Sequence, residues 1–384
     1  MRFKKLAIIC VFPLLSVAAF AQVFTDTASL HHGHAYSTAT LVDNGGSIGT
    51  VLVVGGYNAD GTVVTGAEIY TANYQTWTDN PHNTNHGHAM HTATYIPTSG
   101  KIIVVGGVNN NGQVILNAEL WDPGTDRFTD TGSPHHGHSQ HTAVWIPTIG
   151  KVLICGGVSS GSTITQTAEL YDPGTGTFTD TGSLQYAHRA FTATWIPAIG
   201  MVLIAGGFDA SGSPSTAAEL YNPVSGTFSV TGSLHHAHAY HTAALLPSTG
   251  SQGTVLVNSG FDIGGGATQH VSRYAELYDP VSGTFSDTGS LHHDHAVGAA
   301  TYIPTLLPAG KVLVNSGYNS DLSASEFAEL YDPTTFMWTD TASLDHGHSA
   351  GTAVWIPSGV NKVLVNSGYD VNGSVTQAAA LYTP

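Results

Sequence analysis

A two-residue motif that ends in glycine and follows an apolar run recurs along this 384-residue chain. The first four copies are Gly-Gly and the later ones are Ser-Gly, and they are spaced at about 50 residues. These doublets begin at Gly55, Gly106, Gly156, Gly206, Ser259, Ser316 and Ser367. Self-similarity at a fixed period means that one small unit is repeated and that neighbouring units bury their apolar faces against each other.

Each unit contains four segments with the pattern of a β-strand, and the third unit shows them clearly. His141–Pro147 (HTAVWIP) alternates and ends at a proline, and Lys151–Gly157 (KVLICGG) is apolar throughout, as in a strand buried on both faces. Thr167–Pro173 (TAELYDP) alternates again, and the Thr-rich Thr177–Ser183 suits an exposed outer strand. Four short strands in a period near 50 residues predict an all-β fold, a β-propeller with seven blades.

The two ends of the chain complement each other. The last unit stops after its third strand segment, AAALYTP (Ala378–Pro384), whereas VFTDTASL (Val23–Leu30) has the pattern of a fourth strand without a partner. We therefore expect residues 23–29 to complete the seventh blade, which leaves no open sheet edge. Residues 22–384 would then form a single propeller domain.

Residues 1–21 have the pattern of a signal peptide. Arg2, Lys4 and Lys5 precede the apolar run Leu6–Val17, and Ala19-Phe20-Ala21 has the small-x-small pattern of a cleavage site. The run is too short and wrongly flanked for a transmembrane helix. The sequence therefore predicts export, to the periplasm or the extracellular space.

Composition limits the partners that the chain can have. Its formal net charge is −16 and only 9% of its residues are charged, and removing the signal peptide would also remove three basic residues. Such a surface repels nucleic acid and anionic lipid but attracts cations. We expect no nucleic-acid partner, no membrane span and a monomer. Cys155 would be the sole cysteine of the mature chain, which rules out an intrachain disulfide.

The repeated motifs resemble those of the kelch family of propellers, in the form found in secreted bacterial proteins. The matching features are the doublet, AELYDP (Ala168–Pro173 and its equivalents) and the TGTF or SGTF that follows. The resemblance implies a kelch-type propeller in which the segments that cross between blades form the mouth of an axial channel, where ligands often bind. The chain departs from the family in its Ser-Gly doublets, in the missing Glu of AAALYTP, and in having His where the family usually has Arg before the first strand.

Histidines are concentrated in these crossing segments, as in SLHHGHAYST (Ser29–Thr38), and only His82 and His270 lie outside them. Alignment places a His-x-His pair in six crossings, and the exception has Tyr186 and His188. In an extended segment, residues i and i+2 project to the same side, so that one pair can chelate one ion. A ring of such pairs around the channel mouth predicts a transition-metal site for copper or zinc, either for sequestration or as the centre of a metalloenzyme.

The candidate metal ligands are the members of these pairs. They are His32, His34, His86, His88, His136, His138, His188, His236, His238, His293, His295, His346 and His348. The alternative is that duplication copied a loop whose histidines only cap or stack. His91, His141 and His241 project to the opposite face, and we interpret them as packing residues. The leading His31, His135, His235 and His292 would face solvent or lie outside the ligand shell.

Two further functions remain open. In the fourth crossing, SLQYAHRAFT, Tyr186 and His188 could act as an acid–base pair with Arg189 holding a carboxylate or sulfate, as in a polysaccharide-active enzyme. The chain could also be a non-enzymatic module that presents its loop face to a glycan or a protein. A galactose-oxidase-like copper radical site needs a cysteine linked to a tyrosine, and Cys155 occupies a position that is apolar in the other units.

Overall fold

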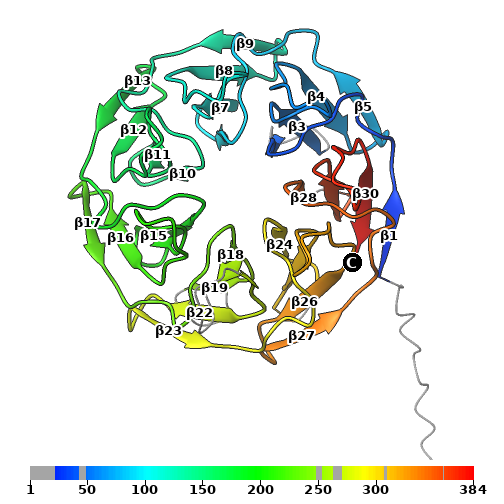
Figure 1. The fold of residues 1–384 in the computed structure, drawn as a ribbon. Helices are drawn as coiled ribbons and strands as arrows, with labels where there is room; N and C mark the ends of the chain where they lie inside the picture. The colour runs from blue at the N-terminus through cyan, green and yellow to red at the C-terminus, as the bar shows by residue number, and fades with distance from the viewer. Residues whose placement is uncertain (1–21, 43–48, 248–252, 263–269, 307–308, 358) are drawn as a thin grey trace, which may run out of the picture.

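The computed structural model describes residues 22–42, 49–247, 253–262, 270–306, 309–357 and 359–384. These residues form seven four-stranded antiparallel sheets that stand around a central axis (Figure 1). The predicted seven-bladed β-propeller is therefore confirmed. None of the described residues lies in a helix long and apolar enough to cross a membrane, and the predicted signal peptide lies outside the described residues.

The blades are numbered one to seven from β2 onward. The innermost strands are β2 (Thr38–Val42), β6 (Thr92–Ile96), β10 (Thr142–Ile146), β14 (Thr192–Ile196), β18 (Thr242–Leu246), β24 (Ala299–Ile303) and β28 (Thr352–Ile356). The second strands are β3 (Thr50–Val54), β7 (Lys101–Val105), β11 (Lys151–Cys155), β15 (Met201–Ala205), β19 (Thr254–Asn258), β25 (Lys311–Asn315) and β29 (Lys362–Asn366). The third strands are β4 (Ala67–Thr71), β8 (Ala118–Asp122), β12 (Ala168–Asp172), β16 (Ala218–Asn222), β22 (Ala275–Asp279), β26 (Ala328–Asp332) and β30 (Ala379–Thr383). The outer strands are β5 (Thr76–Asp79), β9 (Arg127–Asp130), β13 (Thr177–Asp180), β17 (Thr227–Val230), β23 (Thr284–Asp287), β27 (Met337–Asp340) and β1 (Val23–Asp26). A short hairpin of β20 (Phe261–Asp262) and β21 (His270–Val271) extends one loop of blade five.

The N-terminal strand completes the last blade, as the sequence predicts. β1 pairs antiparallel with β30, from Val23 opposite Thr383 to Asp26 opposite Ala380. The first and last described strands therefore lie side by side at the periphery (Figure 1). This pairing covers an edge that would otherwise be open.

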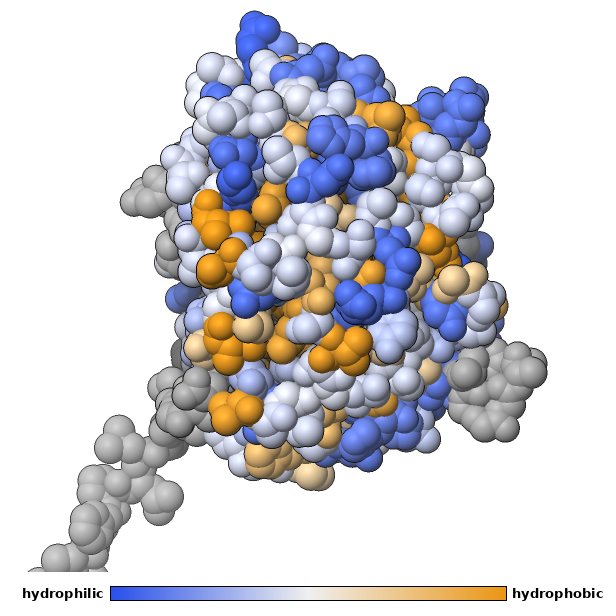
Figure 2. Space-filling model, turned by 90° about the vertical axis from the view of Figure 1, so that its left-hand side faces the viewer, coloured by the Kyte–Doolittle hydropathy of each residue, from blue (hydrophilic) through white to orange (hydrophobic). Residues whose placement is uncertain are grey.

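The apolar core lies between adjacent blades. The second strands are buried along four of their five residues, and one cluster joins Leu153 and Cys155 of β11 to Val202 and Ile204 of β15. Hydroxyl groups tie neighbouring blades together outside this core, as where Thr131 Oγ1 lies 2.9 Å from the hydroxyl of the buried Tyr171. On the outer side of the ring, near β13 and β17, polar and apolar residues are interspersed (Figure 2).

The crossing segments and the loops between second and third strands share one end of the ring. An isolated bridge joins Ala35 of the first crossing to Tyr57, and Tyr57 to Val63 of the adjacent loop. Equivalent bridges occur in the other described crossings. This end, the loop face, carries the histidine-rich segments.

Candidate functional site

Each crossing segment runs inward over the loop face of the blade that it enters. In blade one, His31 lies beside Asp79 at the end of the outer strand, His34 lies beside Glu68 of β4, and Tyr36 reaches the axis. The expectation that the His-x-His pairs surround the channel mouth is therefore wrong. The pairs lie over the blades, and the residues that follow them line the mouth.

The second histidine of each pair is buried and bound on both sides of its ring. His138 Nδ1 lies 2.7 Å from the carbonyl oxygen of Gly156, the first residue of the doublet, and its Nε2 lies 3.3 Å from Glu169 Oε1. Glu169 also accepts the amides of His135 and His136 at 2.8 Å. Burial alone raises the pKa of this carboxyl group, but the hydrogen bonds from His138 and the two amides outweigh it and hold the pKa below its usual value.

The same arrangement recurs in six blades. It is formed by His34, His88, His138, His188, His238 and His295 with Glu68, Glu119, Glu169, Glu219, Glu276 and Glu329. In blade seven, His348 keeps the bond to the Ser367 carbonyl, but Ala380 stands where the other blades have Glu. The Nδ1 and Nε2 atoms of the six paired rings already have partners, so in this arrangement these second histidines hold the crossing segment in place and offer no free nitrogen to a metal ion.

The leading histidine and the first histidine of the pair share a partner that the sequence did not predict, the aspartate at the end of the outer strand. In blade one, His31 Nδ1 lies 2.8 Å and His32 Nε2 3.8 Å from the same oxygen of Asp79, Oδ1. We call such a group a rim triad. The rim triads are His31/His32/Asp79, His135/His136/Asp180, His235/His236/Asp287 and His292/His293/Asp340. The two distances span 2.7–3.0 Å and 3.5–3.8 Å across the four blades.

Two other blades carry part of this arrangement. His86 Nε2 lies 3.6 Å from Asp130, with Asn85 in the place of the leading histidine, and His346 Nε2 lies 3.5 Å from Asp26. Blade four has none of it, because Gln185 and Tyr186 replace the histidines and Val230 replaces the aspartate. The sequence did contain a signal for these partners, namely the aspartate that recurs at the end of the outer-strand motif TFTD and its equivalents in other blades.

Groups with the composition of a metal site lie at the rim of the loop face. In five blades a leading or first histidine, the buried Glu and the rim Asp bring ligand atoms within 4.8 Å of one another. The Glu oxygens are already occupied, so the partly exposed His and Asp side chains are the groups available to an ion. The hydrogen bond to Asp79 raises the pKa of His31, which shows how the carboxylate favours positive charge at this position. In the described part of the chain, such groups occur at the rim rather than at the mouth.

The channel mouth is built from backbone. Seven residues, one from each crossing, form a closed circle in which each N–H donates to the carbonyl of the residue in the preceding blade, at 2.9–3.2 Å. They are Tyr36, Met90, Gln140, Ala190, Tyr240, Val297 and Ala350, all with φ between 49° and 57°. Together with their neighbours they line a pocket of about 220 Å³.

The structure brings Tyr186 and His188 into edge-to-face contact but directs Arg189 away from them, toward Gln140. Tyr186 is exposed on blade four, His188 is buried between Gly206 and Glu219, and Arg189 lies near the mouth. Arg189 Nη1 donates to Gln140 Oε1 at 2.7 Å, and its guanidinium stacks over Phe208. A buried, doubly bonded imidazole does not have the geometry of an acid–base partner for Tyr186.

The histidines that follow the second histidine of a pair by three residues pack in the interior, as the sequence predicts. His91, His141 and His241 are buried, and each Nε2 lies about 3 Å from the hydroxyl of a threonine in the preceding blade. Burial, followed by nearby histidines, holds their pKa values well below the usual value, so these rings are neutral.

No protein-family model and no curated protein matches this chain. Several solved structures are similar to this chain. A fungal alcohol oxidase of the AA5 family, in complex with copper, aligns with a TM-score of 0.72 and 16% identity, over 95% of this chain and 77% of its own. YjhT aligns with a TM-score of 0.61 and 14% identity, over 82% of this chain and 99% of its own. These likenesses establish the propeller fold alone.

The single cysteine among the described residues does not line the pocket at the axis, where a galactose-oxidase-like copper radical site would need it. Cys155 is buried in β11, where burial raises its pKa to about 12, and its sulfur lies 3.5 Å from Thr142 Oγ1. Its placement in the core is as the sequence indicates. The described His, Glu and Asp groups that could hold a metal ion lie at the rim.

Proposed function

We propose that this chain is an exported kelch-type propeller that binds transition-metal ions, copper or zinc, at the rim triads of its loop face. The observation that carries the proposal is the convergence of two imidazole nitrogens on one carboxylate oxygen, repeated in four blades. The signal-peptide pattern of residues 1–21 supports export, and the repeated doublet and AELYDP motifs support the kelch assignment.

The donor atoms suit borderline metal ions. Zinc binds imidazole nitrogen and carboxylate oxygen at about 2.0–2.2 Å, and copper(II) also favours nitrogen and oxygen ligands. The carboxylate oxygen lies 2.7–3.8 Å from each of the two imidazole nitrogens, which is close to the separation of two ligands of one ion at such bond lengths. Three protein ligands leave a position for water, and several similar sites with partial exposure suit reversible sequestration better than one catalytic centre.

Metal stoichiometry tests this proposal. Protein stripped with EDTA and equilibrated with Zn²⁺ or Cu²⁺ is expected to take up as many as four ions per chain, one for each rim triad. The substitutions Asp79→Asn, Asp180→Asn, Asp287→Asn and Asp340→Asn together are expected to remove most of this uptake, because they delete the charged ligand and preserve its shape. Elemental mass spectrometry after gel filtration measures the content.

The matched control is His270→Gln, which removes an exposed histidine outside the crossings and is expected to leave the content unchanged. Uptake by the quadruple variant equal to that of the parent protein would refute the assignment to the rim triads.

Metal release should follow histidine protonation. Imidazoles must be neutral to bind a metal, so lowering the pH from 7 to 5 is expected to release most of the bound ions. The Asp-dependent rise in the pKa of His31 strengthens this competition, because it favours the proton over the metal at that ring. A competition titration with a chromogenic chelator at each pH measures the release, and full retention at pH 5 would argue against imidazole ligands.

A further inference from the structure

Blade four differs from its neighbours by a coordinated set of replacements. Tyr186 replaces the first histidine and Val230 replaces the rim aspartate, and a pocket of about 690 Å³ lies here. Its volume falls within the range of about 300–1,000 Å³ that is typical of small-molecule sites. The loss of one rim triad thus coincides with the appearance of a pocket.

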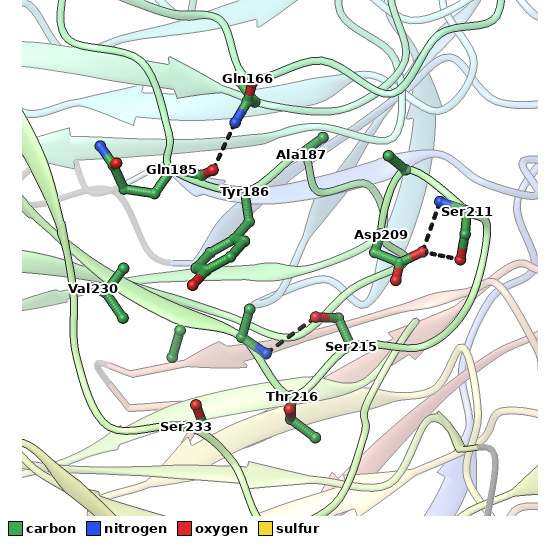
Figure 3. A pocket seen from close by; sticks show the side chains of 13 residues that line it. Gln166, Gln185, Tyr186, Ala187, Asp209, Ser211, Ser215, Thr216, Val230 and Ser233 are labelled. Atoms are coloured by element: carbon green, nitrogen blue, oxygen red, sulfur yellow. Dashed lines mark hydrogen bonds between the residues drawn. The ribbon is translucent and has the colours of Figure 1, made fainter.

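The ring of Tyr186 stands in the middle of this pocket (Figure 3). Gln166 and Gln185 lie on one side of it, Ser215 and Thr216 lie on another, and Asp209 with Ser211 forms a further wall (Figure 3). The lining includes no lysine or arginine. An exposed aromatic ring among amides, hydroxyls and one carboxylate can contact the apolar face of a ligand and hydrogen-bond its polar groups.

The backbone beneath this ring is fixed. The amides of Gln185 and Tyr186 donate to the two carboxylate oxygens of the buried Glu219 at 2.7 and 2.9 Å. The ring of Tyr186 also meets the buried His188 edge-to-face, with centroids 6.3 Å apart. The aromatic surface is therefore held in place before a ligand arrives, which lowers the entropic cost of binding.

Other blades show what occupies the space in front of this ring. His236 and His293 stand where blade four has Tyr186, and each is covered by a parallel ring, Tyr274 at 3.5 Å and Phe327 at 3.7 Å between centroids. The residue equivalent to Tyr274 and Phe327 in blade four is Ala217. An aromatic side chain thus fills the stacking position in these two blades. In blade four the position is open, because Ala217 has no ring.

We propose that this pocket binds a neutral sugar unit of a glycan, with its ring stacked on Tyr186 in the position that Tyr274 and Phe327 fill in other blades. The hydroxyl groups of the sugar would bond to Gln166, Ser215 and Thr216. The carboxylate of Asp209 and the absence of a basic residue from the lining disfavour acidic sugars. This proposal does not depend on metal binding at the rim.

Binding of defined oligosaccharides tests the proposal on the whole mature protein in EDTA. Cellotetraose, xylotetraose and mannotetraose are the neutral probes and tetragalacturonate is the acidic one, measured by saturation-transfer NMR and calorimetry. We expect at least one neutral probe to bind and the acidic probe not to bind. Tyr186→Ala should raise Kd at least about tenfold, whereas Tyr186→Phe should stay close to the parent value, because it keeps the stacking surface.

A second variant tests the same geometry independently. Ala217→Phe is expected to abolish binding by placing the ring of the protein where the sugar would stack. Tyr74→Ala is the matched control, because Tyr74 is 78% exposed outside the pocket. Failure of all neutral probes to bind at millimolar concentration would overturn the proposal, as would an unchanged Kd in both Tyr186→Ala and Ala217→Phe.

Discussion

The substitution Glu329→Ala is expected to lower the free energy of unfolding by about 3–5 kcal/mol, the range observed when one partner of a buried ion pair is removed. Glu329 is buried and accepts the amides of His292 and His293 at 2.8 Å and faces His295 Nε2 at 3.3 Å. Alanine would leave three donors without an acceptor in a site that water does not reach. Denaturant-induced unfolding, followed by tryptophan fluorescence, measures the change.

The same blade supplies a control for this prediction. Glu326 is exposed, so Glu326→Ala is expected to change stability by less than about 0.5 kcal/mol. Glu329→Gln should fall between the two variants, because its carbonyl oxygen still accepts a hydrogen bond. If Glu329→Ala costs no more than Glu326→Ala, the buried pair is not the anchor of the crossing segment.

Acid is expected to destabilise the fold through the three neutral histidines His91, His141 and His241. Their pKa values are lowered in the folded protein, so below pH of about 6.5 the unfolded chain binds protons that the folded chain does not. The stabilisation is complete above that pH and falls by as much as about 1.4 kcal/mol per pH unit for each ring. His31, whose pKa is raised, acts in the opposite direction but is exposed and screened.

The window from pH 6.5 to 5 separates this effect from that of the carboxylates, and His348, whose pKa burial also lowers, adds to it. Glu68, Glu169, Glu276 and Glu329 have lowered pKa values, so their contribution persists above about pH 4.3 and is lost only as the pH falls further. The triple variant His91→Phe, His141→Phe and His241→Phe uses the residue that blade four has there, Phe191, and should flatten the dependence in this window. Unfolding midpoints measured at several pH values decide the matter, and an unchanged slope in the triple variant would contradict the prediction.

The blades were readable from sequence because a period of about 50 residues and strand-length apolar runs determine them locally. The expected segment Lys151–Gly157 contains β11, and Thr167–Pro173 contains β12. Closure by residues 23–29 was also readable, since an unpaired strand at each end of the repeat has one obvious partner. The structure places that strand at Val23–Asp26.

The site was less readable because its partners are distant in sequence. Alternation along the chain indicated which histidines share a side. It did not indicate which residue of each crossing segment lies at the axis. The spacing could not show that Asp79 meets His31, or that Glu68 meets His34, because these contacts require the outer and third strands to lie under the crossing. The pocket at Tyr186 needed Val230 and Ala217 as well, and each of these replacements looks neutral when taken alone.

The circle of seven peptide groups at the mouth has a consequence for how this protein can evolve. Its bonds use backbone atoms only, and the seven positions hold tyrosine, methionine, glutamine, alanine and valine within one chain. Since these bonds do not involve side chains, the circle accepts different residues in different blades, although all seven adopt a positive φ that L side chains rarely take. The side chains at the axis can therefore vary between blades while the circle of backbone bonds that closes the mouth persists.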